Sequence, residues 1–505
     1  MSANQAITST RVLLDGELVP AVVIYSTASG KIVDIVTSTN AVDRNLKLKL
    51  HGVSSVKDVG DLVVMPGLVD AHVHLNEPGR TEWEGFETGT KAAAAGGVTT
   101  VIDMPLNAIP PTTTVENLNI KTNAARGQCW VDVGFWGGVV PGNEKDLVPL
   151  INNGVRGFKC FMIESGVDEF PAVSRDDLIT CFKELNGQPT VMMFHAEQAP
   201  NEPEAKETPE PSAEEDIQAY STFLNSRPDS YEVDAIKTIV ELAPTAPDLN
   251  LHIVHLASAE ALPLVRKARA EKMRLTAETC FHYLTFHAEE IPSKATMYKC
   301  CPPIRNESNK KELWNALLAN DIQTVVSDHS PCTPHLKHLE AGDFVSAWGG
   351  IASVGLGLPV IWSEAQKHYP NITLGDIARW MGQNTAAQVG LEHRKGSIEI
   401  GKDADFCIFD PSAVWTLDQT EMHFKNKVSP YHERNITGKV KETILAGQTV
   451  YTAEQGHVKQ PTGKLLLEKR SLQGAAFQNG NVIDNKQSVL TSATDELVGQ
   501  RVASA

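Results

Sequence analysis

The chain shows two kinds of hydrophobic pattern, and the change between them predicts its organisation. From Arg11 to Val64 the apolar residues form short β-branched runs separated by Gly, Ser and Asp, which is typical of a small sheet. From Pro66 to about Val389, apolar strands alternate with amphipathic helices. The β-rich pattern returns at Gly396. We therefore expect a central α/β region between two β-rich ends.

The central region repeats a strand followed by a helix eight times. Strands are predicted at 67–74, 98–104, 131–135, 155–161, 190–195, 249–255, 275–280 and 323–329. Helices are predicted at 82–95, 115–126, 144–152, 175–185, 231–242, 259–270, 309–319, 350–367 and 374–389. Such a repeat implies a parallel sheet, and eight strands close a barrel. The expected fold class is α/β, a TIM-type eight-stranded parallel β/α barrel with a small β-sandwich domain formed from both chain ends.

These patterns also give domain boundaries. With 505 residues the chain is longer than one core usually supports. We expect the barrel at 65–395 and a composite β-sandwich at 1–64 and 396–469. Residues 470–505 are rich in Asn, Gln, Ser and Ala, which predicts a poorly ordered tail.

Composition narrows the class of partner and the compartment. A net charge of -17 without a basic tract argues against nucleic-acid binding. Met1–Thr10 lacks the pattern of a secretory signal, and no apolar run reaches the ~20 residues that span a membrane. The eight cysteines are scattered without a CxxC pair, which favours reduced thiols. We expect a cytoplasmic protein that acts on a small molecule and has no membrane partner.

Metal-binding side chains occur at the ends of several predicted strands. His72 and His74 close the first strand and point the same way, so they can bind one metal ion. His195, His255 and Asp328 end the fifth, sixth and eighth strands. Half-buried structural histidines are the alternative interpretation, but barrels of this kind place catalytic groups at the carboxyl ends of their strands.

Lys159 lies in the otherwise apolar fourth strand, where a lysine is costly unless it is neutralised, paired or modified. A free ammonium would repel a cation, whereas a carbamate formed with CO₂ could bridge two metals. Four imidazoles, the carbamate, Asp328 and a hydroxide nearly balance two divalent ions. Two ions about 3.5–4 Å apart can polarise a carbonyl and supply a hydroxide nucleophile. Asp328 is then both ligand and general base.

Three further histidines have other interpretations. His252 faces away from the predicted ligands by strand parity, which indicates a structural role. His282 follows the seventh strand and is compatible with either substrate contact or packing. His329 faces away from Asp328, where it could support a ligand.

The motifs together resemble the amidohydrolase superfamily, specifically its cyclic-amidase branch of dihydroorotases, hydantoinases and allantoinases. The segments that carry the resemblance are 67–80, 157–162, 195–197, 252–258, 301–305, 327–331 and 396–405. The resemblance implies that His72 and His74 hold one metal and His195 and His255 the other. It implies that Lys159 is N6-carboxylated and bridges both ions, and that the protein is a homo-oligomer, specifically a tetramer. The sequence does not show which metal is bound, since such sites accept Zn, Co, Mn or Fe, and zinc is the expected metal.

Within the branch, residues 76–86 and 159–171 resemble eukaryotic allantoinases, which implies opening of allantoin to allantoate. Dihydroorotases carry Arg where this chain has Asn76, and a neutral group suits an uncharged substrate. Glu164 stands where hydantoinases usually have Tyr. By resemblance, substrate contacts are expected from Asn76, Ser165, and main-chain groups at Cys301 and Gly349.

Two alternatives remain open from the sequence. One is hydantoinase, dihydropyrimidinase or dihydroorotase activity on the same scaffold. The other is a non-catalytic scaffold protein, since some relatives keep the barrel and lose the ligands. Every ligand position is filled here, which favours an enzyme.

Overall fold

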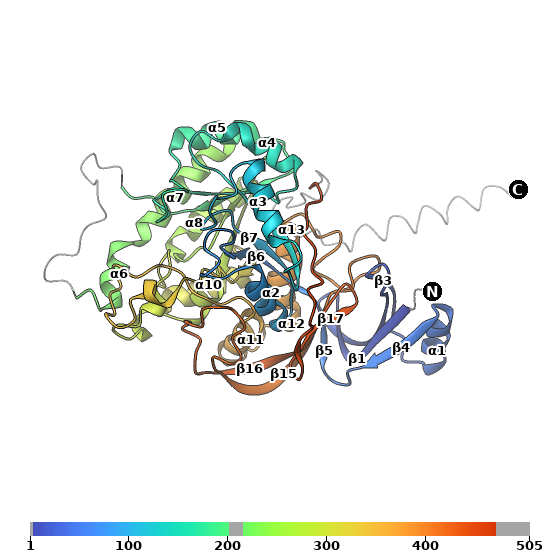
Figure 1. The fold of residues 1–505 in the computed structure, drawn as a ribbon. Coiled ribbons are helices and arrows are strands. Elements are labelled where there is room, and N and C mark those ends of the chain that lie inside the picture. The colour runs from blue at the N-terminus through green and yellow to red at the C-terminus, as the bar shows by residue number, and fades with distance from the viewer. Residues whose placement is uncertain (1–3, 201–215, 471–505) are drawn as a thin grey trace, which may run out of the picture.

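The structure, a computed structural model, describes residues 4–200 and 216–470 (Figure 1). Within them, eight parallel strands form a barrel, which confirms the predicted fold class. These strands are β6 (Leu68–Val73), β7 (Val98–Asp103), β8 (Asp132–Phe135) with its continuation β9 (Gly137–Gly138), β10 (Phe158–Phe161), β11 (Val191–His195), β12 (Asn250–Ile253), β13 (Leu275–Cys280) and β14 (Thr324–Val326).

The barrel consists of two hydrogen-bonded groups of strands, β6-β7-β8 and β9 to β14 in order. Main-chain contacts join the groups on both sides. The Arg156 N–H donates to the Phe135 carbonyl at 2.8 Å, and the His74 N–H donates to the His329 carbonyl at 2.8 Å. Val73 also pairs with His329 in parallel. The segment that follows β14 therefore lies beside the end of β6, which brings the first and eighth strand ends together.

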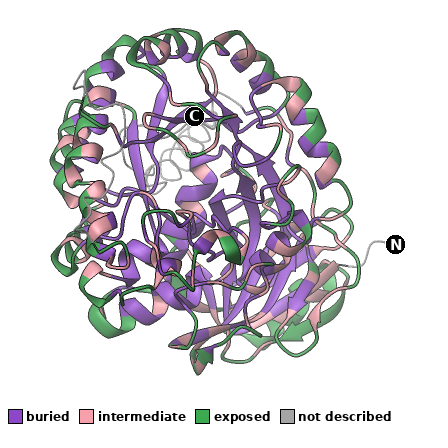
Figure 2. Cartoon of the chain, turned by 60° about the vertical axis from the view of Figure 1, so that its left-hand side comes forward, coloured by how far each residue is buried: buried purple, intermediate pink, exposed green. Residues whose placement is uncertain are grey.

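Helices cover the outside of the barrel, and Figure 2 shows buried strands inside a ring of helices with exposed outer faces. The α-helices are α2 (Phe86–Ala95), α3 (Val115–Ala125), α4 (Glu144–Asn152), α5 (Arg175–Leu185), α6 (Tyr220–Ser226), α7 (Asp229–Leu242), α8 (Leu262–Ala270), α9 (Phe281–Thr285), α10 (Glu307–Leu318), α11 (Gly357–His368), α12 (Leu374–Ala378) and α13 (Asn384–Gln388). Short 3₁₀ turns are η1 (Ala243–Thr245), η2 (Ala259–Ala261), η3 (Ala288–Glu290), η4 (Thr296–Tyr298) and η5 (Pro334–Lys337), and η6 (Arg379–Gln383) is a π-helical turn.

Local signals explain where some helices begin and why others begin later than predicted. Ser174 and Asp177 form a capping box that starts α5 at the predicted residue. The helix predicted at 82–95 begins only at Phe86, because Glu84 turns inward and accepts from the Lys425 N–H. The helix predicted at 350–367 begins at Gly357, because Ile351 pairs with His329 as extended chain.

The two β-rich ends of the chain are hydrogen-bonded into one nine-stranded sheet within the described residues. Its strands are β1 (Asn4–Leu14), β2 (Glu17–Ser26), β3 (Lys31–Val36), β4 (Val53–Asp58), β5 (Val63–Pro66), β15 (Phe406–Leu417), β16 (Arg434–Leu445), β17 (Gln448–Thr452) and β18 (Gly456–His457). β5 lies between β1 and β15 and so joins the two ends. The sequence did not predict α1 (Ala41–Leu50), which begins with Asn40 accepting from the Val42 N–H.

The described chain ends at the amino-terminal floor of the barrel. The Leu466 N–H donates to the Val133 carbonyl at 2.8 Å, and the Arg470 guanidinium donates to the Arg156 carbonyl at 2.8 Å. The predicted tail lies outside the described residues from residue 471 onwards. Among the helices of the described part, none is both long enough and apolar enough to cross a membrane.

Candidate metal centre and active-site cavity

The structure brings all six predicted metal-binding side chains together at the carboxyl end of the barrel. They come from β6, β10 and β11 and from the residues that follow β6, β12 and β14. All are buried, and all line one cavity of about 370 Å³. They are His72, His74, Lys159, His195, His255 and Asp328.

One half of the centre is formed by His72, His74 and Asp328. Oδ1 of Asp328 lies 3.0 Å from Nε2 of His72 and 3.5 Å from Nε2 of His74. The donor atoms of the three residues lie within 4.8 Å of one another, which is close enough for a single metal ion. Burial raises the pKa of the Asp328 carboxyl, but His72 and His74 outweigh burial and hold this pKa well below its usual range. Asp328 is therefore an anion.

The other half is formed by Lys159, His195 and His255. The Lys159 amine lies 3.5 Å from Nε2 of His255, whose ring centroid is 4.6 Å from that of His195. The His195 ring stacks on Phe161 at 4.4 Å, which fixes its plane. Burial lowers the pKa of Lys159 to about 8, so the neutral amine is accessible near neutral pH.

The donor set fits metal ions. Nδ1 of His255 is a buried ring nitrogen that has no hydrogen-bond partner, and Nε2 of His72 has the Asp328 carboxylate beside it. Buried polar atoms in proteins are normally satisfied, so the unpaired nitrogen of His255 fits a ligand that the chain itself does not provide. Imidazole and carboxylate are the donors that zinc and similar divalent ions prefer.

Two carboxylates hold ligand histidines from behind and so determine which ring nitrogen remains available. Glu278 contacts Nδ1 of His72, which leaves Nε2 for a metal. Glu197 contacts Nε2 of His195 at 2.6 Å, which leaves Nδ1. Such outer partners usually fix the tautomer and ring orientation of a ligand histidine.

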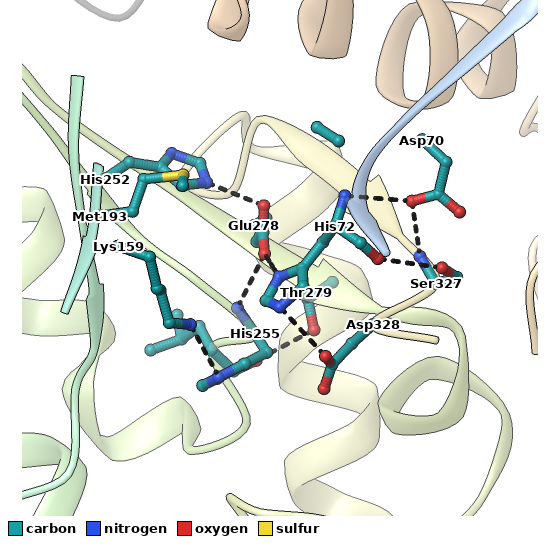
Figure 3. A network of polar contacts seen from close by, with 12 residues as sticks. Asp70, His72, Lys159, Met193, His252, His255, Glu278, Thr279, Ser327 and Asp328 are labelled. Carbon is teal, nitrogen blue, oxygen red and sulfur yellow. Dashed lines mark hydrogen bonds and ion pairs between the residues drawn. The ribbon is translucent and has the colours of Figure 1, made fainter. Parts of the chain in front are cut away.

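Sequence reasoning missed Glu278. It lies on β13, is fully buried, and joins His72 to His252, as Figure 3 shows. Burial raises the pKa of the Glu278 carboxyl, but His72 and His252 outweigh burial and hold this pKa below its usual range. A signal was present, because an acidic residue in the middle of a buried strand is as costly as Lys159.

The other histidines have different surroundings. His252 contacts Thr276 at 2.7 Å and Glu278 at 3.0 Å, so it supports the centre from outside. Both ring nitrogens of His282 are buried without a partner, and His282 does not line the cavity. His329 lies 3.1 Å from Glu84 and accepts from the Ser353 N–H, which connects the eighth strand end to the following chain.

Three of the predicted substrate-binding residues line the cavity. Cys301 and Gly349 lie side by side, and a Cβ at Gly349 would stand 2.9 Å from the Cys301 sulfur. Only glycine fits this wall without displacing Cys301. Ser165 also lines the cavity, but its hydroxyl donates to the Phe170 carbonyl at 2.6 Å.

The structure does not bring Asn76 to the cavity wall. Its backbone has a φ of 62°, and its side chain is buried and donates to the Pro331 carbonyl at 3.4 Å. Arg80 is engaged by Glu169 and by the Asn107 carbonyl and does not line the cavity. The predicted contact between Asn76 and substrate therefore lacks geometric support.

The cavity wall contains polar residues that the sequence did not single out. Asn107 lies 3.4 Å from Nδ1 of His74, and Arg227 forms an ion pair with Glu197 at 2.6 Å. Both come from segments between strands, where sequence spacing gives no position relative to the barrel mouth. The wall thus offers both neutral and cationic groups to a substrate.

Comparisons with known proteins agree with this geometry. The model of the amidohydrolase family matches residues 63–450. The allantoinase of Saccharomyces cerevisiae is 52% identical over 467 residues, which cover 92% of this chain and 99% of that protein. The allantoinase of Streptomyces avermitilis is 44% identical over 458 residues, covering 91% and 97%. Among solved structures, the L-hydantoinase (dihydropyrimidinase) from Arthrobacter aurescens has a TM-score of 0.81 at 26% identity, covering 93% of this chain and 100% of that one.

Proposed function

The chain belongs to the amidohydrolase family, and on this premise we propose that it hydrolyses the cyclic amide of allantoin to give allantoate. The observation that carries the proposal is the convergence of four histidines, Lys159 and Asp328 on one buried cavity. The similarity to allantoinases over almost the whole chain favours allantoin over other cyclic amides.

The family is metal-dependent, and we propose that two divalent ions, specifically zinc, bind here. His72 and His74 would hold one ion, and His195 and His255 the other. Lys159, carboxylated by CO₂, would bridge both, and Asp328 would complete the set. When bound, two such ions provide a nucleophile at neutral pH and polarise the amide carbonyl.

We assign the transfer of the proton to Asp328. Its carboxylate is ionised and reaches into the cavity between His72 and His74. As general base it takes a proton from the attacking water as the new C–O bond forms. It then returns this proton to the ring nitrogen as the C–N bond breaks, so the ring opens to a carboxylate and a ureido group.

The rest of the cavity positions the ring. Main-chain groups at Cys301 and Gly349 form a wall without a side chain at position 349, so a flat ring can approach the backbone closely. The hydroxyl of Ser165 already donates to a carbonyl within its own loop. Ser165 would therefore contact the substrate through its main-chain groups. Asn76 would not contact the substrate. It would influence substrate binding by stabilising the loop whose Pro331 carbonyl it binds.

One assay tests the proposal. The metal-loaded protein is offered allantoin, hydantoin, dihydrouracil and dihydroorotate in parallel, and we expect the highest kcat/KM on allantoin. A higher kcat/KM on hydantoin or dihydrouracil would support the hydantoinase alternative. Equal efficiency on dihydroorotate would show that the cations of the wall, Arg227 and Lys299, accept its carboxylate.

The carbamate is tested at Lys159. Lys159→Ala should lose activity, and a short carboxylic acid added with metal should restore part of it by replacing the bridging oxygens. Lys159→Arg is the matched control, because it keeps a cation and cannot be rescued. Mass spectrometry of the native protein should show one added CO₂, and an unmodified lysine in a fully active protein would contradict the proposal.

Two wider proposals concern assembly and location. We propose a homo-oligomer, specifically a tetramer, which light scattering of the purified protein would test.

We propose the cytoplasm as the compartment, since all eight cysteines are free thiols, as expected in a reducing environment. Imaging of the tagged full chain tests this.

A further inference from the structure

We propose that Glu278 is a positioning residue for the metal centre and supplies the negative charge that completes its balance. This inference rests on the proposed function for the presence of two metal ions. Glu278 itself touches neither the cavity nor, on this proposal, the ions. It acts through His72 and through the segment that carries His255.

Four donors converge on the Glu278 carboxylate, which is fully buried. Oε1 accepts from Nδ1 of His72 and from the main-chain N–H of His255 at 3.3 Å. Oε2 accepts from Nε2 of His252 at 3.0 Å and from the Gln388 amide at 3.4 Å. One carboxylate therefore holds a ligand ring from each half of the centre, one by its side chain and one by its backbone (Figure 3).

In the described residues Glu278 has no Lys or Arg partner, a property that it shares with the buried carboxylates of Asp70, Glu84 and Asp328. In the described chain, its ion-pair contacts are with His72 and His252 alone, and no Lys or Arg lies within 4.0 Å of it. Glu197, by contrast, pairs with Arg227, and Glu232 pairs with Arg305. A buried anion without a Lys or Arg partner is costly, and a metal ion held by His72 would offset that cost.

The charge of the metal centre supplies that balance. Two divalent ions carry four positive charges. A Lys159 carbamate, Asp328 and a hydroxide provide three negative charges, and the histidines are neutral as ligands. Glu278 provides the fourth. With His72 donating from Nδ1, its Nε2 lone pair faces the cavity, and the carboxylate makes this imidazole a more basic ligand.

The test compares Glu278→Gln with Asp405→Asn in the full chain. Asp405 is also buried, but it lies at the opposite end of the barrel, 2.7 Å from the Lys395 amine. When Asp405 is replaced, Lys395 still has Asp132 and Asp403 as ion-pair partners. Each protein is stripped and titrated with Zn²⁺ against a chelator of known affinity. Unfolding of the metal-free forms is recorded separately. The metal titration needs no substrate, so it succeeds or fails independently of activity on allantoin.

We expect Glu278→Gln to bind Zn²⁺ about 10–100-fold more weakly than the wild type, the range typical of an outer partner of a ligand histidine. Glu278→Asp, which keeps the negative charge, should lose less Zn²⁺ affinity than Glu278→Gln. Asp405→Asn should bind Zn²⁺ as the wild type does. Wild-type affinity in Glu278→Gln, or an equal loss in Asp405→Asn, would overturn the proposal. If the Gln variant does not fold, a hundredfold loss in Glu278→Asp would overturn it instead.

Discussion

Each end of the barrel contains a buried lysine, and the two lysines differ in whether a carboxylate lies beside them. At the amino-terminal floor, the buried Lys395 amine lies 2.6 Å from Asp132, 2.7 Å from Asp405 and 3.0 Å from Asp403. Arg394 adds a second cation on Asp403 at 2.7 Å. At the carboxyl end, the buried Lys159 amine has no carboxylate at ion-pair distance in the described residues, and its contact is a histidine ring at 3.5 Å.

The difference separates stability from function. The Lys395 cluster at the floor is complete without a ligand, because each of its charges has an opposite charge beside it. The carboxyl end leaves a ring nitrogen of His255 without a partner, and the Lys159 amine there has no carboxylate beside it. Barrels of this class place chemistry at the carboxyl end and stability at the floor. Changes at one end should therefore leave the property governed by the other end intact.

The largest expected effect is on turnover when a ligand is removed from the carboxyl end. His74→Ala should reduce kcat/KM by more than the ~10²–10³-fold cost of deleting one charge-stabilising donor, since it weakens a metal site. His74 is preferred to His72 because it has no contact with Glu278. Metal content by mass spectrometry should fall while circular dichroism is unchanged. Full metal loading in this variant would contradict the assignment of His74 as a metal ligand at the carboxyl end.

Asp328→Asn should separate base catalysis from metal binding. The amide oxygen can still face His72 and His74, but it cannot take a proton. We expect kcat to fall about 10²–10⁴-fold, the usual contribution of a general base, with a smaller change in metal content. Single-turnover kinetics on allantoin measures the effect. Near-normal kcat would remove Asp328 from the role of base.

Lys395→Met should produce the opposite result at the floor. Removing the cation leaves three carboxylates buried without it, and breaking a buried ion pair typically costs about 3–5 kcal/mol of folding free energy. Denaturant unfolding of the metal-free protein measures the loss, and the Zn²⁺ affinity of the folded fraction should not change. Lys311→Met, which removes an exposed pair with Glu307, is the matched control and should cost far less folding free energy than Lys395→Met. A floor variant that loses metal while remaining stable would contradict the separation.

The smallest effect concerns acid stability. Burial raises the pKa of Asp403, but Lys395, Lys31 and Arg394 outweigh burial and lower this pKa to about 2. A depressed folded-state pKa contributes stability above the unfolded value near ~3.9, and that stability is lost as pH falls towards 2. The unfolding free energy of the wild type falls between pH 5 and pH 3, and in Asp403→Asn this fall should be smaller by about 1–2 kcal/mol. An unchanged slope would show that the floor cations do not act through Asp403.

Periodicity determined the barrel from the sequence. Alternating apolar strands and amphipathic helices specify a parallel sheet, and parity along a strand fixes which residues face inward. Because the carboxyl ends of all barrel strands meet at one rim, polar residues at those ends had to converge. This is why His72, His195 and Asp328 could be grouped although they are far apart in the chain.

Only the tertiary structure decided what touches these residues. A buried acidic residue within a strand was a signal for Glu278, but no sequence spacing shows that its partner is His72. Asn76 was expected at the substrate, yet its left-handed backbone turns the side chain towards Pro331. Asn107 and Arg227 reach the cavity from segments between strands, whose paths depend on packing rather than on period. The sequence thus determined which groups lie on the rim, because strand geometry is local. Their partners depended on contacts that form only when the barrel closes.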